Sequence, residues 1–144
     1  MRHETKGLDY VDTVVNVRYA ETDQMGIVYH ANYLVWFEVG RVAWCHARGF
    51  RYSDLEQQHD RMMMVAEASC RYRAPARFED EIVIRTAVAS ATDKVVRFHY
   101  EVRRKTTGQL LANGETAHVV VDETLRPARL PEKYRKHFLL PKGD

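Results

Sequence analysis

The chain has 144 residues, which is enough for one domain with a buried core over 1–144 and too short for two domains of ordinary size. Hydrophobic residues make up 45% and charged residues 29%, a globular balance that excludes disordered and fibrous proteins. Because 22 Lys and Arg face 20 Asp and Glu, the net charge of +2 gives no bulk attraction to nucleic acid.

The first predicted element is a strand over residues 11–19. Its odd-numbered residues are Val, Thr, Val, Val and Tyr, and Asp, Asn and Arg lie among the residues between them. This alternation is typical of a half-buried strand. Residues 20–32 then break all periodicity, and Gly26 supplies the backbone freedom that such a loop needs.

A helix is predicted from Tyr33, because apolar residues recur there at steps of three and four. The residues on this face are Tyr33, Phe37, Gly40, Trp44 and Ala47, whereas Glu38, Arg41, Cys45 and Arg48 form a more polar strip. Asn32 is the expected N-cap and Gly49 the residue that ends the helix. Gly40 inside a helix costs about 1 kcal/mol relative to Ala unless it allows another backbone to approach.

The second half of the chain predicts strands. After a polar segment at 53–61, strands are expected at 62–73, 81–91, 95–104 and 110–121, and a short helix at 131–138. Short turns between neighbouring strands favour antiparallel pairing. The sequence therefore predicts an α+β domain in which one long helix covers the apolar face of a single sheet.

The loop before the long helix holds the candidate chemistry. Glu21, Asp23, Tyr29 and His30 all lie close upstream of the helix start. Unpaired backbone N–H groups at a helix N-terminus can hold a carbonyl oxygen that becomes negative during acyl transfer. A carboxylate beside that carbonyl can attack it or remove a proton from water. An Asp before a helix is also a common cap or turn former, so both interpretations stay open.

The stretch from Arg18 to Tyr33, RYAETDQMGIVYHANY, resembles the signature of the 4-hydroxybenzoyl-CoA thioesterase family. It is most similar to the bacterial acyl-CoA thioesterases associated with the Tol–Pal system. The shared frame is Asp, two variable residues, Gly, Ile or Val, Val, an aromatic residue, a variable residue that is often His, a small residue or Pro, Asn or Ser, and Tyr. Residues 72–80 also resemble a turn of those enzymes, and the resemblance covers about residues 12–125 in element order.

The resemblance implies a hotdog fold, in which a curved five-stranded antiparallel sheet wraps around the long helix, in a homodimer or homotetramer. It places Asp23 as the catalytic carboxylate and the backbone N–H of His30 as the group that polarises the thioester carbonyl. Gly26, Tyr29 and Tyr33 become substrate-binding residues, with the two tyrosines beside the acyl group. The implied activity is hydrolysis of a small or medium acyl-CoA, and coenzyme A is part of the substrate rather than a cofactor.

Other candidate residues have ordinary explanations. Glu38 is a candidate because another hotdog branch works with a helical glutamate, but an ion pair with Arg41 three residues later is the simpler expectation. Cys45 and His46 point apart by about 100° on a helix, which favours a packed cysteine over a Cys/His pair. The Met62–Met64 run is expected to fill a strand rather than line an acyl channel. The seven histidines show no metal-ligand spacing.

Two other function classes remain open, a hotdog hydratase or dehydratase and a non-catalytic acyl-CoA-binding module. Arginine recognises phosphate with paired donors, so several arginines are candidates for the coenzyme A phosphates. They are Arg71, Arg73, Arg77, Arg97 and Arg103. Two cysteines without a spaced pattern favour a cytoplasmic setting, and no secretory signal, membrane span or nucleic-acid partner is expected.

Overall fold

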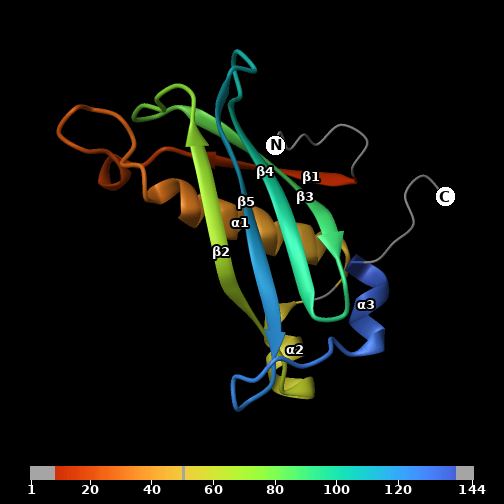
Figure 1. Ribbon diagram of the computed structural model, residues 1–144. Helices are drawn as coiled ribbons and strands as arrows, with labels where there is room; N and C mark the ends of the chain where they lie inside the picture. The colour runs from red at the N-terminus through yellow and green to blue at the C-terminus, as the bar shows by residue number, and fades with distance from the viewer. Residues whose placement is uncertain (1–8, 50, 139–144) are drawn as a thin grey trace.

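The computed structural model describes residues 9–49 and 51–138. Its elements are β1 (Tyr10–Asn16), η1 (Tyr19–Glu21), α1 (Asn32–Ala47), α2 (Tyr52–His59), β2 (Met62–Tyr72), β3 (Glu81–Ala91), β4 (Val95–Arg104), β5 (Leu110–Val121) and α3 (Glu132–Phe138). The strands form one sheet in the order β1-β3-β4-β5-β2, and every neighbouring pair is antiparallel. Figure 1 shows α1 running behind the curved sheet. The predicted α+β architecture is confirmed.

The core lies between α1 and the inner face of the sheet. The predicted inner face of β4 is fully buried, and it consists of Val96, Phe98, Tyr100 and Val102. The ring of Phe37 on α1 stacks on that of Tyr100, with centroids 4.2 Å apart and planes 3° from parallel. Complete burial of each such side chain stabilises the fold by about 1.5–3 kcal/mol.

α1 packs closely against β3 at Gly40. A Cβ atom at this position would lie 2.3 Å from Oγ1 of Thr86 and 2.8 Å from Cγ2 of Ile84. The close approach expected at Gly40 is therefore present, although β3 contributes side chains to it rather than backbone. The low helix propensity of glycine is offset here by helix–sheet packing.

The prediction for the first strand was too long at its C-terminal end. β1 ends at Asn16, and the N–H of Glu21 donates to the carbonyl of Arg18 (2.9 Å), which closes the short helix η1. Tyr19 is consequently 76% exposed instead of lying on the buried face. A turn can begin with a residue of high strand propensity, and alternation alone does not show where pairing stops.

Residues 52–59 form α2, where the sequence predicted only a polar segment. Leu55 is its one buried residue, so no apolar periodicity is visible. Asp60 ends the helix in the left-handed region, with φ 52°. In α1 the expected faces hold except that Cys45 is buried and Ala47 is exposed. Among the described residues no helix is both long enough and apolar enough to cross a membrane.

Candidate active site

The predicted catalytic loop is a short hairpin. Thr22 and Val28 form an antiparallel bridge, and the N–H of Asp23 donates to the carbonyl of Ile27 (2.9 Å). The N–H of Gly26 donates to the carbonyl of Asp23 (3.0 Å). Gly26 has φ +79°, the left-handed conformation that favours glycine. Figure 1 shows the segment between η1 and α1 projecting as a loop beyond the ends of the strands.

Asp23 is exposed and has one engaged oxygen. Its Oδ1 accepts a hydrogen bond from the N–H of Met25 (2.8 Å), the geometry of an Asx turn. Within residues 9–49 and 51–138, no group is hydrogen-bonded or ion-paired to its other oxygen, Oδ2. Asp23 is therefore a turn former through Oδ1, and Oδ2 is available to react with a substrate or a water molecule.

A second turn, at residues 73–80, supports the hairpin from the side. The N–H of Val28 donates to the carbonyl of Ala76 (2.9 Å). The guanidinium of Arg104 holds this turn by donating to the carbonyl of Pro75 (2.8 Å) and to Oδ2 of Asp80 (3.2 Å). The stretch predicted to be familial at 72–80 thus lies directly against the loop that carries Asp23.

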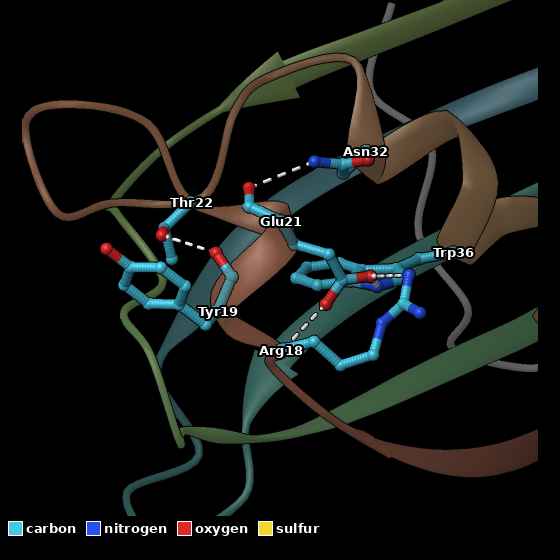
Figure 2. Close-up of polar contacts among 6 residues, drawn as sticks. All are labelled: Arg18, Tyr19, Glu21, Thr22, Asn32 and Trp36. Carbon is cyan, nitrogen blue, oxygen red and sulfur yellow. Dashed lines mark hydrogen bonds and ion pairs between the residues drawn. The ribbon is translucent and has the colours of Figure 1, made fainter.

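The start of α1 differs from the prediction for Asn32. Ala31 is the N-cap and Asn32 is the first helical residue, so Asn32 is not the cap. Its side-chain amide instead donates to the carbonyl of Glu21 (3.0 Å), as Figure 2 shows. The N–H of Asn32 donates to the carbonyl of Tyr29 (3.0 Å). The helix start is therefore attached to the loop by the side chain that was expected to cap it.

His30 presents a free backbone donor at this helix start. Its carbonyl accepts hydrogen bonds from the hydroxyl of Tyr72 (2.8 Å) and from the N–H of Tyr33 (3.3 Å). No acceptor in the described part of the chain is bonded to the N–H of His30 or of Ala31. Because the carbonyls of residues 29 and 30 are held, the peptides that bear these two N–H groups have a fixed orientation.

A cleft of about 340 Å³ lies beside the helix start. It is lined by Ile27, Val28, His30, Tyr33, Tyr72, Arg73, Ala74 and Pro75. Two predicted site residues, His30 and Tyr33, therefore meet at one surface, and Tyr33 does so although it is only 3% exposed. Asp23, Gly26 and Tyr29 do not line the cleft. Tyr29 is half-exposed, and its ring lies 4.4 Å from that of His30 between centroids.

Tyr72 is the functional candidate that sequence reasoning missed. Its ring meets Tyr33 edge-to-face at 5.1 Å and lies 6.2 Å from His30. Burial, with a contact to the Cys70 thiol, raises the pKa of Tyr72 to about 12. The hydroxyl therefore stays protonated and remains a donor to His30 at neutral pH. The resemblance of residues 72–80 was the one sequence signal that pointed to this position.

The other candidates mostly follow their ordinary explanations. The Cys45 thiol is fully buried and its pKa is raised to about 12 by burial, as expected for a packed cysteine. Glu38 is exposed and forms no ion pair with Arg41, contrary to the prediction, because the Arg41 guanidinium donates to the Tyr100 hydroxyl (3.3 Å). In the described ranges no group of three or more His, Cys, Asp or Glu side chains is placed to hold a metal ion.

The five arginines that are candidates for the coenzyme A phosphates differ in their ion pairs and in their position relative to the cleft. Arg97 pairs with Glu67 at 3.4 Å and Arg103 with Glu101 at 3.1 Å, so both already have carboxylates. Arg71 and Arg77 are exposed, and of the five candidates only Arg73 lines the cleft.

Residues 17–138 match the thioesterase-like superfamily, and the chain belongs to this family. It is 38% identical over 125 residues to the putative acyl-CoA thioesterase YneP of Bacillus subtilis, with 86% of each chain covered. It is 29% identical to the acyl-CoA thioester hydrolase YbgC of Escherichia coli O157:H7, over 86% of this chain and 92% of the relative. The crystal structure of a DHNA-CoA thioesterase from Staphylococcus aureus superposes with a TM-score of 0.85 and 30% identity, covering 90% of this chain and 88% of that one. The predicted hotdog fold and thioesterase family are confirmed.

Proposed function

We propose that this protein hydrolyses the thioester bond of a small or medium acyl-CoA, with Asp23 as nucleophile or general base. The observation that carries the proposal is the unpaired N–H of His30 at the start of α1, beside a cleft that His30 itself lines. The names of the relatives, an acyl-CoA thioesterase and an acyl-CoA thioester hydrolase, support the same substrate class.

The thioester carbonyl oxygen accepts a hydrogen bond from the N–H of His30, and the neighbouring N–H of Ala31 is a second donor. Both N–H groups lie at the positive end of the α1 dipole, where negative charge on the oxygen is stabilised. Since their peptides are already held through their carbonyls, no reorganisation is needed when the charge develops.

Asp23 acts by one of two routes, as a nucleophile or as a general base. In the first, its free Oδ2 attacks the carbonyl carbon, the C–S bond breaks, and water hydrolyses the mixed anhydride that results. In the second, Asp23 takes a proton from a water whose oxygen attacks the same carbon. In both routes the coenzyme A thiolate leaves readily, because a thiol pKa is about 8.5. A single turnover in ¹⁸O-water that leaves label in the Asp23 carboxyl group identifies the first route, with attack of water on the Asp23 carbon of the anhydride. The second route places label in the product acid alone, as does attack of water on the acyl carbon of the anhydride.

The remaining assignments belong to the same proposal. Gly26 shapes the turn that presents Asp23, Tyr29 and Tyr33 contact the acyl group, and Arg73 reaches a coenzyme A phosphate. The imidazole of His30 orients the substrate. Coenzyme A arrives as part of the substrate, so it is not a cofactor. The reaction uses no metal, and it takes place in the cytoplasm.

The test is thiol release from a panel of aromatic, short aliphatic and longer acyl-CoA thioesters by wild-type protein and Asp23→Asn. The substitution keeps the shape of the side chain and the Asx turn, but it removes nucleophile and base, so kcat should fall by at least about 100-fold with folding preserved. Asp60→Asn is the matched control, because Asp60 is also an exposed turn aspartate and Asn tolerates its left-handed backbone. Near-normal turnover in Asp23→Asn would refute the mechanism. Hydration of an enoyl thioester without thiol release would favour the hydratase class.

The proposal includes a homodimer as the minimum assembly. Among the described strands, β2 lies at the edge of the sheet and pairs only with β5, so one side of its 11 residues is open, and open edges of this length are normally covered. Apolar side chains near this edge and on the first turn of α1 are exposed, among them Val65 at 52% and Val35 at 49%. Light scattering after size-exclusion chromatography should give at least twice the 16.8 kDa chain mass. A monomeric wild-type protein at micromolar concentration would rule the dimer out, whereas dissociation by Val65→Lys would place the interface at β2.

A further inference from the structure

Glu21 has a buried carboxylate two residues before Asp23. The residue is 5% exposed, and its carboxylate accepts three hydrogen bonds, one of which is also an ion pair between Oε2 and the Arg18 guanidinium (3.5 Å). Oε1 accepts a hydrogen bond from the N–H of Arg18 (2.8 Å), and Oε2 accepts one from the indole N–H of Trp36 (3.2 Å). Figure 2 shows the carboxylate between Arg18, whose guanidinium folds back onto it, and Trp36. A carboxylate leaves water at a large energetic cost, so a buried one that is fully hydrogen-bonded is built into its surroundings.

The backbone of Glu21 makes a second set of attachments at the same point. Its carbonyl accepts hydrogen bonds from the N–H of Tyr29 (2.8 Å) and from the side chain of Asn32 (3.0 Å). One residue therefore joins the exit of β1, the return arm of the hairpin and the first two turns of α1. These hydrogen bonds of Glu21 fix the orientation of the hairpin relative to the start of α1.

We infer that Glu21 is a positioning residue: its carboxylate, bonded to Trp36, holds the hairpin that bears Asp23 against the start of α1. This inference rests on the proposed function, because it concerns where Asp23 stands during the reaction. Glu21 is not itself the base or nucleophile, since both of its oxygens accept hydrogen bonds and the group is shielded from solvent. Glu21 acts through Asp23.

The hydrogen bonds of the Glu21 carboxylate can be removed without opening the hairpin. The hairpin is closed by its own backbone bonds, from Asp23 to Ile27 and from Gly26 to Asp23, and none involves the Glu21 side chain. An amide at position 21 cannot replace the carboxylate, because Gln has one acceptor oxygen and its NH₂ group would face a second donor. Glu21→Gln therefore leaves either the Arg18 N–H or the Trp36 indole N–H unpaired while nearly preserving side-chain volume.

The experiment measures kcat, KM and amide hydrogen exchange for Glu21→Gln, alone and combined with Asp23→Asn. Since a displacement of about 1 Å at a reacting group costs on the order of 10²-fold in rate, kcat should fall by about 10- to 100-fold. KM should change by less than about threefold, because the cleft is untouched. Exchange at the N–H of Tyr29 should accelerate. Glu56→Gln, at an exposed position of α2, is the matched control and should change none of the three quantities.

Combination with Asp23→Asn separates positioning from general destabilisation. If Glu21 acts through Asp23, Glu21→Gln lowers the residual rate no further once Asp23 is Asn, so the two effects are not additive. If Glu21→Gln lowers kcat by the same factor in the wild-type protein and in Asp23→Asn, the inference is overturned. So would a kcat within about threefold of wild type together with unchanged exchange at Tyr29.

Two further outcomes are decisive. If Glu21→Gln does not fold, Trp36→Phe removes one donor and keeps the carboxylate; a lower kcat then supports the inference, and an unchanged kcat overturns it. If the wild-type protein releases no thiol from any acyl-CoA, the proposed function fails. Faster exchange at Tyr29 in Glu21→Gln would then still support the attachment of the hairpin, and unchanged exchange would overturn that too.

Discussion

Removing the hydroxyl of Tyr72 isolates the hydrogen bond that orients the start of α1. Tyr72→Phe keeps the ring and its edge-to-face contact with Tyr33, and it deletes the 2.8 Å bond to the carbonyl of His30 together with the contact between the hydroxyl and the Cys70 thiol. That carbonyl keeps only the longer bond from the N–H of Tyr33, at 3.3 Å. The peptide that carries the N–H of Ala31 then loses its stronger constraint.

The size of the effect follows from the value of one neutral hydrogen bond, a net of about 0.5–1.5 kcal/mol. If this energy holds the peptide in the orientation that the transition state requires, kcat/KM should fall by about 2- to 12-fold. The loss should be the same from pH 6 to 9, because the raised pKa of Tyr72, about 12, keeps the wild-type hydroxyl protonated throughout.

The assay is thiol release from the best acyl-CoA substrate, measured over this pH range beside Tyr10→Phe. Tyr10 is also a partly exposed strand tyrosine, but it lies on β1 at the opposite edge of the sheet. An unchanged kcat/KM for Tyr72→Phe, or an equal loss in Tyr10→Phe, would refute the role of this bond.

Two further predictions concern the core. Burial lowers the pKa of His118 from 6.5 to about 3. As the pH falls between these two values, His118 is protonated in the unfolded protein while it stays neutral in the folded protein. The unfolding free energy should be fully retained above pH 6.5 and decrease by up to about 1.4 kcal/mol per pH unit below it. Urea unfolding should show a shallower decrease for His118→Gln, and equal slopes would contradict the assignment. Iodoacetamide at pH 8 should leave Cys45 unmodified until the protein unfolds, because burial raises the pKa of its thiol to about 12; labelling of Cys45 in the native state would be inconsistent with this packing.

The sheet and the long helix could be predicted because their periodicity extends over many residues. Val95–Arg104 alternates along its whole length, and its inner face is buried as the alternation requires. Gly49 ends α1 in the left-handed conformation that its residue type suggests. Elements held by one buried side chain could not be found this way, as α2 and its Leu55 illustrate.

The candidate site was predictable only in part. The motif placed Asp23, His30 and Tyr33 in one segment, but the contacts that organise this segment join residues far apart in the chain. Trp36 meets Glu21 across 15 residues, and Tyr72 meets His30 across 42. Such side-chain contacts depend on how helices, loops and strands are arranged in space, and they leave no periodic pattern in the sequence.

The tip of the Asp23 hairpin is a natural place to install chemical probes. Backbone hydrogen bonds and the Asx turn of Asp23 close the hairpin, and within the described residues no hydrogen bond comes from the side chain of Gln24 or Met25. Met25 is 77% exposed, and exchanging such a surface side chain usually alters stability by less than about 0.5 kcal/mol. A spectroscopic label attached there would report on substrate arrival next to the carboxylate while the supporting framework stays as it is.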